Sequence, residues 1–142
     1  MILVDTDHAT FLKYPESERG KRLLARLDAV SKSTKIGMAI VTVEEPMRGW
    51  LAVIAKERQA LHQVSGYREL EKLFGFYREF AIVSFDEATA RRFDELRQQK
   101  LRLGTMDLKI AATALVNDAL LLSANRRDFE RVPSLRVENW LD

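Results

Sequence analysis

Five short apolar runs alternate along the chain with longer stretches of helical spacing, and this alternation limits the folds open to the chain. The runs lie at residues 1–4, 35–43, 80–85, 120–125 and 135–140. Between them, apolar side chains recur every three or four residues among charged ones, as Leu23, Leu27 and Val30 do. Short strands that alternate with amphipathic helices are typical of an α/β fold with a mainly parallel sheet.

Capping residues and apolar stripes predict where several helices lie. Ser17 and Asp86 each precede a helical stretch as an N-cap, and Pro15 ends the helix expected over residues 6–14. A long helix is expected from Thr42 onward, followed by a second one. The apolar stripe of the first is formed by Met47, Trp50, Leu51 and Ile54, and that of the second by Leu70, Leu73, Phe74 and Tyr77.

Length and composition predict one globular domain over residues 1–142. The 46% hydrophobic and 31% charged residues suit a chain with a substantial core. Cysteine is absent, which excludes disulfides, zinc–thiolate sites and thiol nucleophiles. The apolar start of the chain is too short for a signal peptide or a membrane span, so we expect a cytoplasmic protein with no membrane partner.

Acidic and amide side chains follow several of the predicted strands. In parallel sheets, ligands bind beyond the carboxyl ends of the strands. That rule selects five residues, which are Asp5, Glu45, Asp86, Asp107 and Asn125. Carboxylates brought together repel one another unless protons or cations neutralise them, and Mg²⁺ prefers such oxygen ligands.

Each of these acids also has a purely structural interpretation. Asp5 can cap the helix that follows it, and Asp107 can stabilise the positive end of a helix. Glu45 stands three residues after Thr42, which is the spacing of a capping box. Asp86 is assigned to helix capping alone.

Four segments together resemble the PIN-domain family, and specifically the VapC-like ribonuclease toxins of prokaryotic toxin–antitoxin pairs. They read "ILVDTDHAT", "AIVTVEEPMRGW", "GTMDLKIAATAL" and "LLLSANRRDFERVPSLRVENW". The resemblance implies a three-layer α/β/α sandwich around a mainly parallel sheet. It also implies an endoribonuclease, the toxin of such a pair, that hydrolyses RNA phosphodiesters with a water activated by Mg²⁺ or Mn²⁺.

Carried over position by position, the resemblance implies metal ligands at Asp5, Glu45 and Asp107. The fourth catalytic position falls on Asn125, where many relatives have Asp, so a second metal would be held less tightly. Asp128 is the next acid along the chain and has a structural place in relatives. Pro46 is a further departure, and it disfavours helical geometry at Glu45.

The resemblance also assigns supporting roles. Ser123 is expected to orient Asp5 or a bound water, while Thr6 and Asp7 support the ligands. Arg126 and Arg127 follow the Asn125 turn and are candidates for RNA phosphate contacts, although they suit an exposed turn equally well. The mechanism requires no histidine, and His62 is expected at the surface.

Partners follow from the resemblance as well. It implies a homodimer and a small cognate antitoxin whose C-terminal segment lies in a groove near the acids. Aromatic helices offer an apolar surface for it, although core packing is the expected role of at least half of these side chains. The aromatic residues concerned are Trp50, Phe74, Phe76 and Tyr77.

Two other functions compete with the ribonuclease. The segment "DTDHA" approaches the signature of haloacid-dehalogenase-like phosphatases, with Asp5 as nucleophile and Asp7 as general acid. The fit is partial because Ala9 replaces the expected Thr or Val. Alternatively, the domain keeps the fold but acts only as a catalytically weak binding module, because Asn125 adds no charge to the site.

Overall fold

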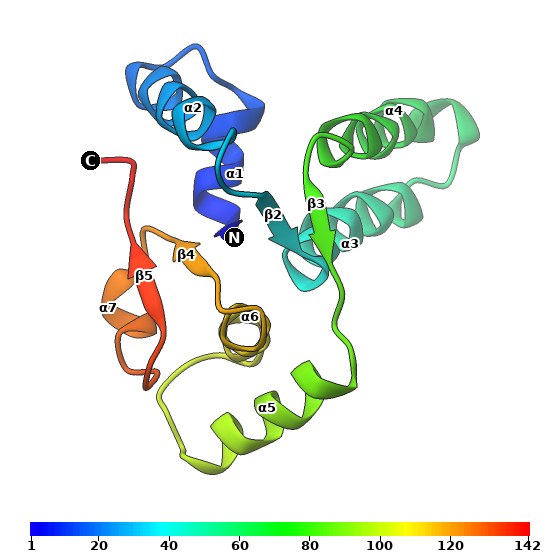
Figure 1. The fold of residues 1–142 in the computed structure, drawn as a ribbon. Coiled ribbons are helices and arrows are strands. Elements are labelled where there is room, and N and C mark those ends of the chain that lie inside the picture. Colours follow the sequence, from blue (N-terminus) through cyan, green and yellow to red (C-terminus); the bar gives the residue numbers. More distant parts are fainter.

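The computed structural model describes residues 1–142 and contains the predicted alternation of strands and helices (Figure 1). The strands are β1 (Ile2–Val4), β2 (Ile36–Ala39), β3 (Ala81–Val83), β4 (Leu120–Leu122) and β5 (Arg136–Glu138). The helices are α1 (Thr6–Lys13), α2 (Glu18–Val30), α3 (Ile40–Lys56), α4 (Ala60–Tyr77), α5 (Glu87–Gln98), α6 (Thr105–Val116) and α7 (Arg126–Phe129). The strands form one sheet in the order β3-β2-β1-β4-β5.

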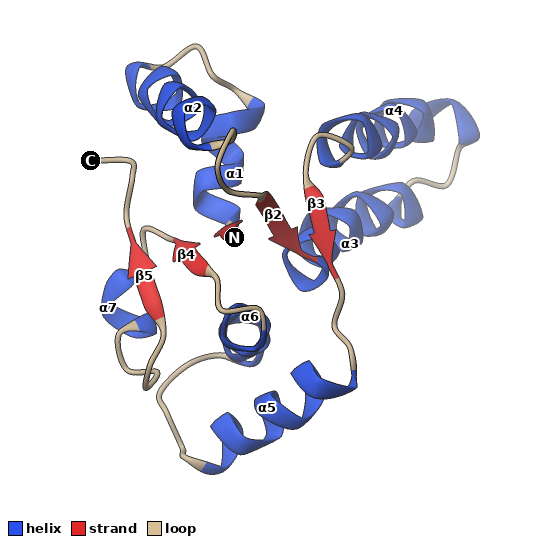
Figure 2. Cartoon of the chain, in the orientation of Figure 1, coloured by secondary structure: helices blue, strands red, loops and turns tan.

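All pairs of neighbouring strands in the sheet are parallel, and helices cover both of its faces (Figure 2). Side chains of β1 alternate between the faces, as the period of a strand requires. Leu3 joins a core with Phe93 of α5 and Ala111 of α6. Ile2 and Val4 belong to the opposite core, which includes residues of α1, α2 and α4. The three-layer α/β/α architecture is therefore confirmed.

The boundary between β2 and α3 differs from the prediction. The apolar run 35–43 was expected to be one strand, but β2 ends at Ala39 and α3 begins at Ile40. A short apolar run fits a buried helix turn as well as a strand, so periodicity alone does not place this boundary. Pro46 lies inside α3, so the expectation that it moves Glu45 away from helical geometry is wrong.

Helices α3 and α4 pack against each other as a hairpin that projects from the sheet (Figure 1). This arrangement explains why only part of their predicted stripes is core. Ile54, Leu73 and Tyr77 are buried, whereas Leu51 is 53% exposed and Phe74 is 59% exposed. Trp50 and Phe76 are half-buried. Of the aromatic side chains considered as a partner surface, only Phe74 is therefore substantially exposed.

The predicted helix caps at Ser17 and Asp86 are confirmed. The Ser17 hydroxyl accepts a hydrogen bond from the N–H of Gly20, and the Asp86 carboxylate accepts one from Thr89. The short helix α7 was not predicted, because a single turn has too few residues to show a period. No helix combines the length and the apolar character that crossing a bilayer requires.

Candidate active site

The strand order creates a switch point at the carboxyl ends of β1 and β4. From β1 the chain proceeds to β2 and β3 on one side, and it later returns to β4 and β5 on the other. Open parallel sheets bind ligands in the crevice at such a point. Asp5 follows β1 and Ser123 follows β4, and pairing of these strands sets Val4 opposite Leu122. Asp5 and Ser123 therefore meet at the switch point.

Acidic and amide side chains from separate parts of the chain line one cavity of about 350 Å³ there. Glu45 comes from α3, Asp107 from the first turn of α6, and Asn125 from the residue before α7. The full lining is Asp5, Thr6, Asp7, Val41, Thr42, Glu45, Met106, Asp107, Ile110 and Asn125. The four residues at the predicted catalytic positions are thus brought together, and Asp86 is not among the lining residues.

Burial, together with neighbouring carboxylates, raises the pKa of two acids in this cavity, Asp5 and Asp107. Asp5 is only 7% exposed, and burial raises its pKa to about 6, with Asp7 and Asp107 adding to the shift. Burial also raises the pKa of Asp107, and the nearby carboxylates of Asp128, Glu45 and Asp7 raise it further. The cavity therefore holds negative charge that no protein cation neutralises fully.

Both oxygens of Asp5 are held by hydrogen bonds. Its Oδ1 accepts from the N–H of Thr6 at 2.8 Å, so Asp5 does cap α1, as its structural interpretation predicted. Its Oδ2 accepts from the hydroxyl of Ser123, also at 2.8 Å. The contact expected between Ser123 and Asp5 is therefore present, and the orientation of the Asp5 carboxylate is fixed from two sides.

Asp7 is occupied by other protein groups. Its Oδ1 lies 2.6 Å from Nδ1 of His8, and its Oδ2 accepts from the N–H of Ala124 at 2.9 Å. Burial alone would raise the pKa of Asp7, but the hydrogen bonds from His8 and Ala124 outweigh it and hold the pKa below its ordinary value. Asp7 is thus an anion that ties α1 to the loop after β4.

Thr42 is a site residue that sequence reasoning missed, because it was considered only as half of a capping box. The N-cap of α3 is Ala39, and no side chain caps this helix. The Thr42 hydroxyl is buried, lines the acidic cavity and has no hydrogen-bond partner. Pro46 also has no N–H to give the Thr42 carbonyl. The predicted capping box is therefore wrong, and the Thr42 hydroxyl remains without a protein partner.

The side chains that follow β4 differ in whether protein groups already bind them. Asn125 donates its backbone N–H to the Ser123 hydroxyl at 3.0 Å, while its side chain does not cap α7. Arg126 is paired with Glu130 at 2.7 Å, so its guanidinium is already partly neutralised. Arg127 is exposed and is the freer candidate for a phosphate contact.

The residues present suit a hydrated divalent cation bound by few protein ligands. No three acidic or histidine side chains are arranged as a complete metal-binding group. The donors lining the cavity are carboxylate, amide and hydroxyl oxygens, which are the ligands of Mg²⁺ and Mn²⁺ rather than of Zn²⁺. Since Mg²⁺ keeps several of its waters, the carboxylates of Asp5 and Asp107, with Glu45 lining the same cavity, are a reasonable fit.

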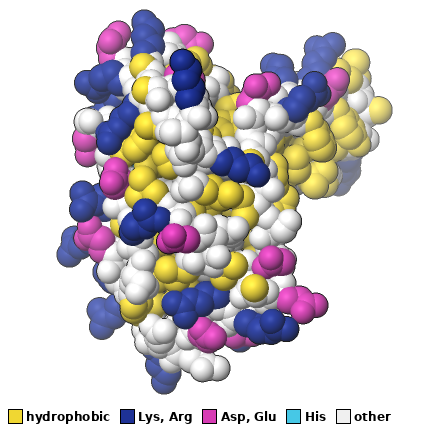
Figure 3. All heavy atoms as spheres, in the orientation of Figure 1, with side chains coloured by type: hydrophobic (Ala, Val, Ile, Leu, Met, Phe, Trp, Pro, Cys, Tyr) yellow, Lys and Arg dark blue, Asp and Glu magenta, His cyan; other side chains and the backbone are white.

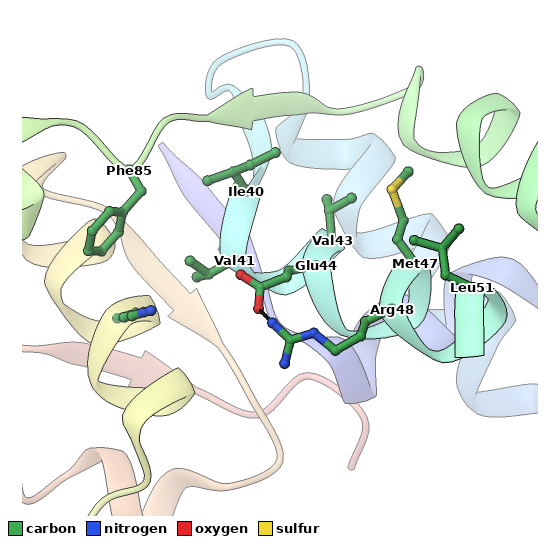
Figure 4. Close-up of a pocket in the computed structure, with 9 residues that line it drawn as sticks. Ile40, Val41, Val43, Glu44, Met47, Arg48, Leu51 and Phe85 are labelled. Atoms are coloured by element: carbon green, nitrogen blue, oxygen red, sulfur yellow. Dashed lines mark hydrogen bonds and ion pairs between the residues drawn. The ribbon is translucent and has the colours of Figure 1, made fainter. Parts of the chain in front are cut away.

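A second, larger cavity of about 510 Å³ shares Val41 of α3 with the acidic cavity. Figure 4 shows the residues that line this second cavity. Its wall is mainly apolar and includes Ile40, Met47, Leu51 and Phe85. The ion pair of Glu44 with Arg48 crosses this wall in Figure 4. Hydrophobic side chains also gather over the neighbouring α3–α4 hairpin in Figure 3. Apolar surface therefore lies beside the acids.

A family model and curated proteins match this chain, and both point to the same family. The family model described as "PIN domain" matches residues 2–135. "Ribonuclease VapC2" of Rickettsia felis is 26% identical over 99% of this chain and 98% of its own length. "tRNA(fMet)-specific endonuclease VapC" of Shigella flexneri is 31% identical, over 51% of this chain and 58% of its own length.

Solved structures share the fold. The structure of DNA-bound VapBC from Salmonella typhimurium superposes with a TM-score of 0.75, covering 99% of both chains at 21% sequence identity. At this level of identity the likeness concerns the fold, which is the same α/β/α arrangement.

Proposed function

This chain belongs to the PIN-domain family, and from that membership we propose that it is a metal-dependent endoribonuclease, the toxin of a toxin–antitoxin pair. The observation that carries the proposal is the gathering of Asp5, Glu45, Asp107 and Asn125 around one cavity at the switch point of the sheet. The full-length similarity to a VapC ribonuclease of Rickettsia felis supports it.

In the proposed site, Mg²⁺ or Mn²⁺ is held by Asp5 and Asp107, with Glu45 completing the ligand set. An ion bound by these residues would supply Lewis-acid chemistry, which lowers the pKa of a water and offsets negative charge on a phosphodiester oxygen. Ser123 orients the Asp5 carboxylate through its hydrogen bond. Asp7 keeps the loop after β4 in place through Ala124.

Polar groups without protein partners are proposed to face the substrate. Thr42 on α3 and Asn125 before α7 both line the cavity, and the Thr42 hydroxyl has no protein partner, so these two side chains are proposed to bind a phosphate oxygen or an attacking water. Arg127 is proposed to contact an RNA phosphate beside the cavity, and Arg126 can do so only if it leaves Glu130.

The phosphatase alternative is not favoured. It requires Asp7 as a general acid, but both oxygens of Asp7 already accept hydrogen bonds from the protein, and its pKa lies below the ordinary value. A group that transfers a proton near neutral pH needs a raised pKa instead. Family membership and the ribonuclease relatives also disfavour both this alternative and the weak binding module.

We further propose a small antitoxin partner and a homodimer. The solved structure that shares the fold is a DNA-bound VapBC from Salmonella typhimurium, which supports the antitoxin. Co-expression with the product of a small neighbouring reading frame, followed by light scattering of the purified complex, tests both partners. The proposal requires a stable complex that contains two copies of this chain. A monomeric chain that binds no such product contradicts it.

Cleavage assays test the enzymatic proposal. Purified protein is incubated with tRNA and with structured and single-stranded RNAs in the presence of Mg²⁺ or Mn²⁺. We expect cleavage by the wild type, loss of cleavage in Asp5→Asn and Asp107→Asn, and unchanged cleavage in Asp86→Asn. The last variant is a matched control, because Asn also caps helices and Asp86 lies outside the cavity. Absence of cleavage of every RNA by the wild type contradicts the proposal.

A further inference from the structure

His8 is completely buried, although the proposed chemistry uses no histidine. It lies on α1 next to Asp7, which in turn contacts the loop that carries Ser123 and Asn125. A buried polar ring must satisfy both of its nitrogens. In His8 each nitrogen has one partner, and the two partners lie on opposite sides of the ring.

The partners of His8 determine its tautomer. Nε2 lies 3.0 Å from the backbone N–H of Trp140, and a backbone N–H can only donate. Nε2 must therefore accept, and the ring proton of the neutral imidazole is on Nδ1. From there it is donated to Oδ1 of Asp7, at 2.6 Å. The backbone of the C-terminal segment thus selects the form of His8 that can hold Asp7.

Asp7 extends this connection to the acidic cavity. Its second oxygen accepts from the N–H of Ala124 at 2.9 Å. Ser123, one residue earlier, donates its hydroxyl to Asp5 at 2.8 Å, and that hydroxyl accepts from the N–H of Asn125 at 3.0 Å. The position of the loop that orients Asp5 therefore depends on an Asp7 carboxylate that is itself held by His8.

The C-terminal segment that carries Trp140, the partner of His8, is held in place by side-chain contacts. The guanidinium of Arg26, on α2, lies 3.8 Å from the centre of the Trp140 ring. The indole N–H of Trp140 donates to Glu138 at 2.7 Å. Trp140 and Leu141 are both buried. The segment after β5 is thus a fixed support for His8.

We propose that His8 is a positioning residue of the metal site, acting through Asp7 on the loop 123–125 and so on the Asp5 carboxylate. This inference rests on the proposed function, since it concerns affinity for the divalent ion. Hydrogen-bond partners behind a metal ligand typically contribute 10-fold to 100-fold to metal affinity. His8 is therefore expected to affect how tightly the ion binds rather than the chemical step.

Two similar amide substitutions separate the two hydrogen bonds of His8. In His8→Asn, the side-chain amide lies near the position of Nδ1 and can donate to Asp7. In His8→Gln, the longer amide reaches the position of Nε2, where it can accept from Trp140 but gives Asp7 no side-chain donor. Oδ1 of Asp7 then keeps only the backbone N–H of residue 8. Leu27→Ala serves as a control for destabilisation alone, because Leu27 is buried in the core on the same face of the sheet.

Binding of Mn²⁺ to each protein is measured by electron paramagnetic resonance of the free ion, well below the melting temperature of every variant. We expect His8→Asn to bind within about 3-fold of the wild type and His8→Gln to bind at least about 10-fold more weakly. Leu27→Ala should bind as the wild type does. Equal affinities of the two His8 variants overturn the role of His8, whereas a wild type that binds no Mn²⁺ contradicts the proposed function itself.

The tautomer has a separate spectroscopic signature. The chain has two histidines, and His62 is exposed. Long-range proton–nitrogen NMR spectra therefore need to distinguish only two rings. One ring should show a protonated Nδ1 and an unprotonated Nε2, and this signal should disappear in His8→Asn. A His8 ring with its proton on Nε2 overturns the proposed connection even if metal binding is normal.

Discussion

At the scale of single residues, Asp5 shows how a helix cap and a candidate metal ligand can be the same side chain. The sequence offered these roles as alternatives, yet one oxygen caps α1 while the other is held by Ser123. The hydrogen bonds stabilise the anion, but burial opposes them and is the larger effect, so the pKa is raised to about 6. Burial of the charged form of Asp5 therefore lowers the free energy of unfolding.

That raised pKa predicts how stability depends on pH. Folded Asp5 binds its proton more tightly than the unfolded chain, whose value is near 3.8. Its contribution to stability is thus complete below about pH 4 and is lost as the pH rises through about 6. The loss amounts to about 3 kcal/mol in the free energy of unfolding.

Urea unfolding of metal-free wild type and Asp5→Asn between pH 4 and pH 7.5 measures this effect. The stability of the wild type relative to the variant should fall across that range, and Mg²⁺ should restore it. A stability difference that is independent of pH contradicts the raised pKa.

Thr42→Val should separate stability from activity. Valine keeps the shape of the side chain and removes a buried hydroxyl that has no partner, so the free energy of unfolding should rise by about 1 kcal/mol. RNA cleavage should fall about 10-fold, the loss expected when a hydrogen bond of about 1.4 kcal/mol to the reacting groups is removed. Chemical denaturation and single-turnover cleavage provide the two measurements. Unchanged cleavage would mean that the hydroxyl has no part in the reaction.

Asn125→Asp tests the effect of the missing fourth charge. A further carboxylate in the cavity should attract the divalent ion more strongly, and we expect the Mg²⁺ concentration for half-maximal cleavage to fall several-fold. Asn125→Ala is the matched control, because it removes the amide without adding charge. If both variants require the same Mg²⁺ concentration as the wild type, residue 125 does not act on the ion.

At the scale of secondary structure, the sequence predicted the helices and strands better than the boundaries between them. Strands such as β1 and helices with capped starts such as α5 were recognisable because the period and the capping residue agree. The start of α3 was not recognisable, since the mainly apolar run "IVTV" shows no helical period and no side chain caps the helix. Exposed residues of the α3–α4 hairpin, such as Leu51 and Phe74, were also out of reach, because periodicity does not say that a helix pair projects from the sheet.

Pro46 gives a prediction about α3. Inside a helix, proline removes one backbone hydrogen bond and costs up to about 3 kcal/mol. We therefore expect Pro46→Ala to raise the free energy of unfolding by more than Gly49→Ala does. Gly49 lies in the same helix, and a methyl group there contacts nothing within 4 Å, so that variant reports helix propensity alone, about 1 kcal/mol. Equal gains in the two variants, measured by urea unfolding, contradict a special cost at Pro46.

At the scale of the whole molecule, the site exists because the strand order reverses between β1 and β4: β2 and β3 lie on one side of β1, and β4 and β5 lie on the other. Asp5 and Asp107 could be chosen from the sequence, because Asp5 follows a strand and Asp107 lies in the first turn of a helix. Glu45 was chosen because it follows the apolar run 35–43, although the structure places it inside α3. Their meeting depends on strand order, which the residues imply only through the family resemblance. His8 contacts Asp7 beside it and the backbone of Trp140, which lies 132 positions further along the chain. No local sequence pattern predicts a contact over that distance.

We propose that the carboxylates of Asp5 after β1, Glu45 in α3 and Asp107 in α6 hold one divalent ion at this switch point. Anomalous diffraction from crystals soaked with Mn²⁺ tests it directly. We expect a peak in the acidic cavity, within about 2.5 Å of oxygens of Asp5 and Asp107 and beside Glu45, that is absent in Asp5→Asn. A peak elsewhere on the molecule, or none at a Mn²⁺ concentration that supports cleavage, would mean that these carboxylates do not hold the ion.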